Sequence, residues 1–230
     1  MFLIGGIQKT SLIDYPKKIA SIVFTQGCNF RCGYCHNPEL LSFDSNNVRY
    51  DISDFLSFLK TRIGKIDGVV ITGGEPTLQS DLYNSIKEIK SLGFSVKLDT
   101  NGSNPQYLEQ LISENLIDYI AMDIKAPLEK YKLITNVEVD TKNIQSSITM
   151  IMNSQIDYEF RTTVLKSLLS FQDFEEIGKL VCNAERYYIQ KFVCSKIYDN
   201  NLKDKNNYSN SEFKEICNIL QKYVKTVQLR

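Results

Sequence analysis

The chain has 230 residues, 43% of them hydrophobic, which predicts one ordinary domain with a substantial core. Lysine plus arginine equals aspartate plus glutamate at 27 each, so the formal net charge of +0 argues against nucleic acid or anionic lipid as a partner. No apolar run approaches the roughly 20 residues that cross a bilayer. The short apolar N-terminus lacks a basic leader, so we expect a cytoplasmic protein without a membrane span.

Short apolar runs rich in Val, Ile, Phe and Tyr alternate with helical patterns. Strands are predicted at 19–25, 68–72, 94–99, 118–124, 157–164 and 187–193, and helices at 51–64, 82–93, 105–115, 143–153, 171–184 and 210–223. Residues 225–230 predict a short closing strand, and the Asn-rich stretch 198–210 a mobile loop. We expect a single domain over 1–230, with a core at about 17–195 and a helix and tail over 196–230.

Strands that alternate with helices predict parallel β/α units and an α/β fold. Six such units fit a partial TIM-type (β/α)6 barrel, although periodicity alone also allows an open doubly wound sheet. Polar or metal-binding residues occur toward the C-terminal end of each predicted strand, where active sites form in parallel barrels. They include Asp99 and Thr100 at the end of the third strand and Asp123 at the end of the fourth.

Three cysteines, Cys28, Cys32 and Cys35, share one short loop in the run TQGCNFRCGYCHNPEL. The spacing C-x3-C-x2-C supplies three thiolates, whereas an Fe–S cubane usually takes four. Three protein ligands leave one iron open, and an open coordination position is typical of catalytic metal sites. The alternative is a structural zinc site with His36 as fourth ligand. Against it, adjacent side chains in extended backbone point opposite ways, so we expect His36 to donate a hydrogen bond near the cluster.

This loop resembles the cluster-binding loop of the radical S-adenosylmethionine (radical SAM) enzymes. Ser11–Leu40, with SLIDYP before the cysteines and HNPEL after them, resembles the start of the anaerobic ribonucleoside-triphosphate reductase activating proteins. These proteins belong with the glycyl-radical-enzyme activases. The resemblance implies a radical SAM partial barrel, a [4Fe–4S] cluster and S-adenosylmethionine (SAM). It implies an enzyme that forms a 5′-deoxyadenosyl radical and removes a Cα hydrogen from a glycine of a partner protein.

The resemblance also implies the partners: a glycyl-radical enzyme, here anaerobic ribonucleotide reductase, as protein substrate, and a flavodoxin or ferredoxin-type electron donor. Pyruvate formate-lyase is a second possible protein substrate. A small-molecule radical SAM enzyme, such as a deazapurine synthase, is another alternative. A non-enzymatic Fe–S electron carrier is a further one, but it would need four cysteine ligands and no GGEP motif.

Several cofactor contacts follow from the resemblance. It places Tyr34 beside the adenine, although packing under the loop explains this residue equally well. The GGEP motif, Gly73–Pro76, becomes the seat of the methionyl amino group, and Glu75 adds charge or shapes the turn. Lys125 is aimed at the ribose or carboxylate of the cofactor, and Arg161 at the cofactor or a cation site. For both cations, an ion pair with a nearby carboxylate is the alternative.

Related activases hold a monovalent cation between strand-end carboxylates. Asp99, Thr100 and Asp123, with the backbone carbonyl of Ala121, form the corresponding oxygen set here. Two close carboxylates repel unless something positive lies between them. The resemblance therefore implies a cation site at this rim.

One departure from the family lies near the sixth strand. Related activases place a histidine there, whereas this sequence has Gln190, Lys191 and Phe192. The remaining cysteines, Cys182, Cys194 and Cys217, are far apart in the sequence and are expected to be packing residues.

Overall fold

One curved eight-stranded sheet runs through the computed structural model, which describes residues 2–43, 50–194, 196–202 and 207–230. The strands follow chain order across the sheet, and every neighbouring pair is parallel except β1 with β2. They are β1 (Ile4–Ser11), β2 (Ala20–Thr25), β3 (Gly68–Gly73), β4 (Ser95–Thr100), β5 (Tyr119–Asp123), β6 (Asp157–Val164), β7 (Arg186–Lys191) and β8 (Thr226–Leu229).

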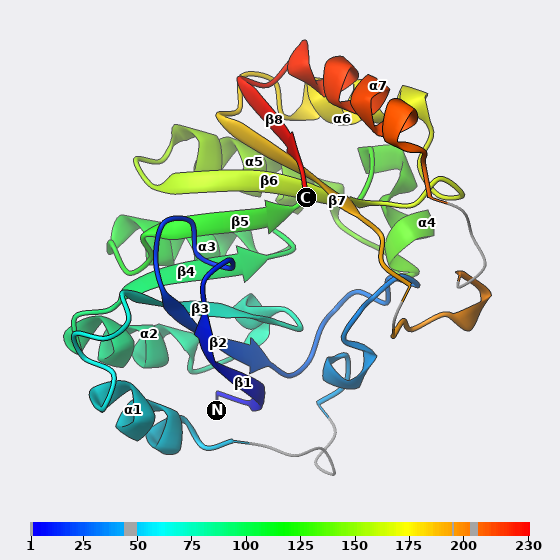
Figure 1. Cartoon of the computed structure of the whole chain (residues 1–230). Helices are drawn as coiled ribbons and strands as arrows, with labels where there is room; N and C mark the ends of the chain where they lie inside the picture. The colour runs from blue at the N-terminus through cyan, green and yellow to red at the C-terminus, as the bar shows by residue number, and fades with distance from the viewer. Residues whose placement is uncertain (1, 44–49, 195, 203–206) are drawn as a thin grey trace.

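Helices cover one face of this sheet (Figure 1). They are α1 (Ile52–Lys60), α2 (Leu82–Ser91), α3 (Pro105–Ser113), α4 (Tyr131–Thr135), α5 (Thr141–Asn153), α6 (Phe171–Leu180) and α7 (Asn210–Gln221). Each long helix buries one apolar stripe, as amphipathic helices do. In α1 this stripe is Phe55, Leu56 and Leu59, and Asp51 caps the helix by accepting from the amide of Ser53.

The main hydrophobic core lies between the helices and the sheet, whereas the other face of the sheet is mostly polar. A small second cluster forms on that inner face, where Tyr15 packs on Tyr119 at 6.0 Å between ring centroids. Tyr15 belongs to the loop between β1 and β2, and Figure 1 shows this hairpin lying in front of the sheet. The inner face of the partial barrel therefore carries mostly polar side chains, and the β1–β2 hairpin packs on this face through Tyr15.

The predicted partial barrel is confirmed. Strands β2 to β7 match the six predicted strands within a residue or two, and the closing strand is present as β8. Among the strands and α-helices of the described residues, β1 and the short helix α4 were not predicted. The helix predicted at 171–184 ends earlier, at Leu180, and that predicted at 51–64 ends at Lys60. The single-domain organisation stays a prediction, supported by β1 and β8 joining the same sheet.

The predicted loop at 198–210 falls partly outside the described residues, at 203–206. Before that gap, Asn200–Leu202 forms a 3-10 turn. Within the described part of the chain, no helix is long and apolar enough to cross a membrane.

Candidate active site

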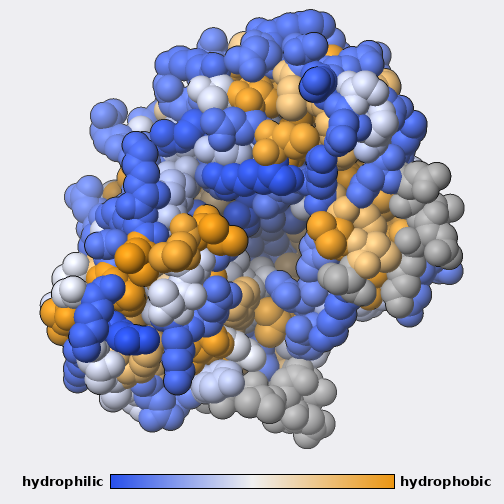
Figure 2. Space-filling view, in the orientation of Figure 1, coloured by the Kyte–Doolittle hydropathy of each residue, from blue (hydrophilic) through white to orange (hydrophobic). Residues whose placement is uncertain are grey.

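A cavity of about 460 Å³ lies at the C-terminal ends of the strands. Figure 2 shows the hollowed face of the molecule, lined largely by hydrophilic residues. The structure brings most of the predicted site residues to this cavity: Cys28, Cys32, Tyr34, Cys35, His36, Gly73, Gly74, Glu75, Asp99, Thr100, Asp123, Lys125 and Arg161. Pro76 is the exception, because it is buried at the start of the 3-10 turn Pro76–Leu78.

The cysteine loop is held at its base by its own two ends. The amide of Gly27 donates to the carbonyl of Leu40 at 2.7 Å, and that of Cys28 donates to Leu41 at 3.2 Å. Gly27 has φ of +88°, a conformation that side-chain-bearing residues rarely adopt. A Cβ atom there would also meet the Phe43 ring at 2.1 Å. The loop therefore leaves and returns to the barrel at one point.

Distant segments hold the middle of the same loop. The amide of Arg31 donates to the carbonyl of Thr135, at the end of α4, at 2.8 Å. On the other flank, the amides of Asp199 and Tyr198 donate to the carbonyls of Gly33 and Cys35 at 2.8 and 3.2 Å. The cysteines are thus presented by a loop that three parts of the chain support.

The three thiols are free and lie at the cavity, with Cys32 buried and Cys28 and Cys35 half-buried. Burial raises the pKa of all three, and that of Cys28 to about 12, so the thiols are protonated until metal displaces the protons. Among the described residues, no three His, Cys, Asp or Glu side chains are arranged to hold a metal ion.

His36 lies beside the residues that directly follow β7. Its Nε2 is 2.9 Å from the carbonyl of Val193, and its ring stacks on Phe192 with centroids 5.7 Å apart. This hydrogen bond and the ring contact fix the position of the His36 side chain at the edge of the cavity.

The glycines of the GGEP motif are required by backbone packing. A Cβ atom on Gly73 would meet the amide nitrogen of Thr25 at 2.4 Å, and one on Gly74 would meet the carbonyl of Gly27 at 2.1 Å. Gly73 also has φ of +113°. The turn after β3 can lie against the start of the cysteine loop only because both residues lack side chains.

Glu75 is a buried anchor for this turn. Its carboxylate accepts from the amides of Thr77 at 3.2 Å and Asn101 at 2.7 Å, and also from the hydroxyls of Thr77 and Thr100. Burial raises the pKa of Glu75, and these hydrogen bonds oppose that effect. Of the two roles expected for Glu75, the contacts favour shaping the turn, because both oxygens are occupied by β4 and its own turn.

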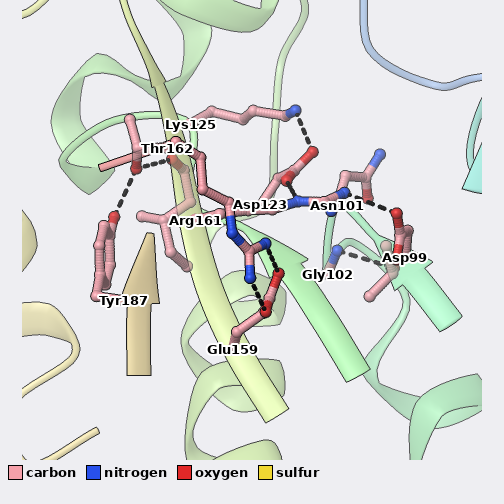
Figure 3. A network of polar contacts seen from close by, with 12 residues as sticks. Asp99, Asn101, Gly102, Asp123, Lys125, Glu159, Arg161, Thr162 and Tyr187 are labelled. Carbon is pink, nitrogen blue, oxygen red and sulfur yellow. Dashed lines mark hydrogen bonds and ion pairs between the residues drawn. The ribbon is translucent and has the colours of Figure 1, made fainter. Parts of the chain in front are cut away.

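Five charged side chains form a largely buried ladder across β4, β5 and β6: Lys97, Asp99, Asp123, Lys125 and Arg161. Figure 3 shows Asp99, Asp123, Lys125 and Arg161 of this ladder. Arg161 donates its Nε to Asp123 Oδ1 and places its Nη2 3.1 Å from Asp99 Oδ2. Lys97 lies 2.5 Å from Asp99 Oδ1, and Lys125 lies 2.8 Å from Asp123 Oδ2. Burial opposes ionisation, but Arg161 and the lysines hold the pKa of both carboxyls below its ordinary value. The two predicted carboxylates do face each other, with Arg161 between them.

Tyr34 is buried between the cysteine loop and Lys125, and burial raises the pKa of its hydroxyl. Its hydroxyl oxygen has no hydrogen-bond partner among the described residues. A buried hydroxyl without a partner is costly. Because Tyr34 lines the cavity, a bound ligand can supply the missing partner.

Sequence reasoning missed several cavity residues, including Asp14, Phe30, Leu41 and Thr163. Asp14 comes from the β1–β2 hairpin and lies within the SLIDYP motif. Gln190 occupies the sixth-strand side of the cavity, where related activases have a histidine.

The expectation that the other cysteines are packing residues is wrong for two of them. Cys182 and Cys194 are exposed, and only Cys217 is half-buried. Cys182 falls outside the apolar stripe because α6 ends at Leu180, and Cys194 follows the end of β7.

A parallel half-barrel with three thiols in the loop after its first parallel strand defines an enzyme that holds a metal cluster and a small cofactor at one rim. Residues 22–181 match the model of the radical SAM superfamily. The chain belongs to this superfamily, which implies a [4Fe–4S] cluster and SAM. The donor set fits: three thiols, an open cavity and an unpartnered tyrosine hydroxyl meet at the same rim.

Relatives extend this similarity along the whole chain. A protein of Methanocaldococcus jannaschii, named as a candidate glycyl-radical enzyme activating enzyme, is 36% identical over 234 residues, covering 99% of this chain and 95% of the relative. The pyruvate formate-lyase-activating enzyme of Streptococcus mutans is 30% identical over 146 residues, covering 58% of this chain and 54% of that enzyme.

Among solved structures, SuiB of Streptococcus suis bound to S-adenosylmethionine superposes with a TM-score of 0.66 at 16% identity. The alignment covers 88% of this chain and 48% of SuiB, so the chain spans about half the length of that protein. At this identity the likeness establishes the fold alone.

Proposed function

We propose that this chain is a glycyl-radical-enzyme activase whose protein substrate is anaerobic, class III ribonucleoside-triphosphate reductase. The observation that carries the proposal is the end-to-end similarity to the Methanocaldococcus jannaschii protein. The choice of reductase rests on the resemblance of Ser11–Leu40 to its activating proteins. In support, Asp14 of SLIDYP lines the cavity, so this motif forms part of the wall of the site.

When bound, the reduced cluster and SAM supply a 5′-deoxyadenosyl radical that removes a hydrogen atom from a Cα position. Cys28, Cys32 and Cys35 would hold the cluster, and the backbone at Gly73 and Gly74 would receive the methionyl ammonium of SAM. The chain needs no acid–base group for this chemistry, which agrees with its single histidine.

The inner face supplies the remaining contacts. Lys125, close to Tyr34 and Cys32, would bind the ribose or carboxylate of SAM. The Tyr34 ring would pack on the adenine, and its hydroxyl would gain the partner that it lacks. A flavodoxin or ferredoxin-type protein would provide the electron. The open side of the half-barrel would admit a flexible glycine segment of the substrate protein.

Pyruvate formate-lyase is the second candidate substrate, because its activating enzyme in Streptococcus mutans shares 30% identity over 58% of this chain. The experiment that separates the two is electron paramagnetic resonance. Reconstituted, reduced enzyme is mixed anaerobically with SAM and either glycyl-radical enzyme, and Cys32→Ala serves as the control without activity. A glycyl radical on the reductase alone supports the proposal. A radical on the lyase alone favours the second candidate, and a radical on neither overturns both.

A further inference from the structure

The monovalent cation that the family resemblance implies does not fit the residues as the structure arranges them. Of the expected oxygen set, the Thr100 hydroxyl donates to Glu75 at 2.7 Å and accepts from the amide of Gly102 at 3.1 Å. It is therefore committed to the turn after β3.

The carboxylates of Asp99 and Asp123 are also occupied by protein partners. Each of the four oxygens of Asp99 and Asp123 already lies beside a cationic side chain, as Arg161 bridges the two groups and one lysine binds each outer oxygen. Figure 3 shows this arrangement around Arg161, Asp99, Asp123 and Lys125. The side chains of Lys97, Asp99 and Arg161 are 3%, 11% and 15% exposed, so water does little to screen the charges at this end of the ladder. Those of Lys125 and Asp123, at the other end, are 16% and 26% exposed.

The net charge of the ladder also argues against a bound monovalent cation. Lys97, Arg161 and Lys125 face two carboxylates, so the ladder carries one net positive charge. A further cation would raise that charge and would have no free carboxylate oxygen to bind. A buried carboxylate pair needs a positive group between its members, and the guanidinium meets this need with directed hydrogen bonds.

We propose that Arg161 takes the place of the monovalent cation in this enzyme, so that SAM binding requires no alkali metal ion. The guanidinium joins the two strand-end carboxylates, and the positive charge left over faces the cavity, where it suits a carboxylate of the ligand. Asp99, Asp123, Lys125 and Arg161 all line that cavity. The inference rests on SAM as ligand and does not depend on which protein is the substrate.

The test is the affinity of the reconstituted enzyme for SAM, measured anaerobically by equilibrium dialysis in buffers whose only monovalent cation is choline, Na⁺ or K⁺. For the wild-type enzyme, we expect the Kd to differ by less than about twofold among these buffers, since no site is available. A saturable tightening by Na⁺ or K⁺ that choline does not produce would overturn the proposal. Broadening of the thallium(I) nuclear magnetic resonance line, a direct probe for a bound monovalent cation, would do so as well.

Removing the guanidinium should create the missing site. Arg161→Ala leaves the two carboxylates facing each other, so its Kd for SAM in choline should rise about tenfold. K⁺ or guanidinium ion should then restore most of this loss. The matched control is Arg186→Ala, which removes an arginine of β7 that pairs with Asp157 outside the cavity. This control should show no cation dependence.

If Arg161→Ala folds and neither ion restores its affinity, Arg161 does not stand in for a cation and the proposal fails. If the variant does not fold, the wild-type titration and the thallium(I) measurement decide the question alone.

Discussion

The backbone amide of Glu75 donates a 2.8 Å hydrogen bond to the carbonyl of Gly27, and this contact joins the turn after β3 to the start of the cysteine loop. The side chain of Glu75 fixes the same turn to β4 through the amide of Asn101. The GGEP motif therefore shapes the loop that presents the thiols, in addition to its proposed contact with the ligand.

Gly74→Ala should prevent correct placement of the cysteine loop. Its Cβ atom would meet the Gly27 carbonyl at 2.1 Å, and backbone atoms cannot move aside as a flexible side chain does. We expect the variant to lose most of its iron and sulfide after reconstitution, measured chemically and by absorbance of the cluster. Gly6→Ala is the control, since its Cβ would make ordinary contacts of 3.6 Å or more with Phe24. Full iron content in Gly74→Ala would contradict this role.

Tyr34→Phe should separate ligand binding from folding. The Tyr34 hydroxyl is buried without a partner among the described residues, so its removal should leave the thermal stability of the ligand-free protein unchanged or raised. In contrast, SAM affinity of the reconstituted variant should fall about fivefold, the effect of losing one hydrogen bond to the ligand. Unchanged affinity would show that the hydroxyl does not contact SAM.

Arg230→Ala should destabilise the inner face of the barrel. Arg230 binds Glu159, whose side chain is fully buried, at 2.8 Å, and lies over the Tyr188 ring at 3.4 Å from its centroid. The Arg230 side chain is itself 40% exposed, but its removal leaves the buried Glu159 carboxylate with the Tyr119 hydroxyl as a donor and without its cationic partner. We therefore expect a loss of about 2 kcal/mol in the free energy of unfolding, measured by urea denaturation.

Two further variants test that explanation. Lys225→Ala removes a lysine from an exposed pair with Glu185, and its effect should stay within about 0.5 kcal/mol. Glu159→Gln should recover part of the loss in the Arg230→Ala background, because a neutral amide costs less to bury than a carboxylate. If the double variant is no more stable than Arg230→Ala, the buried charge is not the cause.

Asp173 should make α6 more stable at neutral than at acid pH. Its carboxylate accepts from Lys130 Nζ and from the amide and hydroxyl of Ser170, at 2.7 to 2.8 Å. Burial opposes its ionisation, but these donors prevail and lower the pKa of Asp173. A lowered folded-state pKa means that the stabilisation is present above about pH 4, the unfolded value. It is lost as the pH falls through the folded value.

The matching variant is Asp173→Asn. At pH 7 it should lose about 1 kcal/mol in the free energy of unfolding. This difference from the wild-type protein should shrink below pH 4 in urea titrations. A difference that stays constant with pH would show that the charge of Asp173 does not stabilise the helix.

The sequence predicted the central strands well because their apolar runs are continuous, as in GVVIT, and buried strands need no other pattern. It did not predict β1, where Gly5 and Gly6 interrupt the run and Gln8, Lys9 and Thr10 are exposed. The short helix α4 has too few residues to show a period.

Site residues within one sequence motif were predictable. Contacts between residues from different segments were not. The cysteines and GGEP could be read directly, and the facing of Asp99 and Asp123 followed from parallel strands. The bridging position of Arg161 depends on side-chain reach across three strands. The contribution of Asp14 depends on how the β1–β2 hairpin folds back. No sequence pattern indicates either the bridging position of Arg161 or the contribution of Asp14.

The cysteine loop is completed by residues far along the chain, at Thr135 and at Tyr198 and Asp199. During synthesis, a ribosome-bound chain cannot close this loop until those later segments have emerged, although the thiols themselves appear early. We therefore expect the cluster to be inserted into the nascent chain only after translation has passed Asp199. Until then the three thiols are exposed to premature metal capture and oxidation.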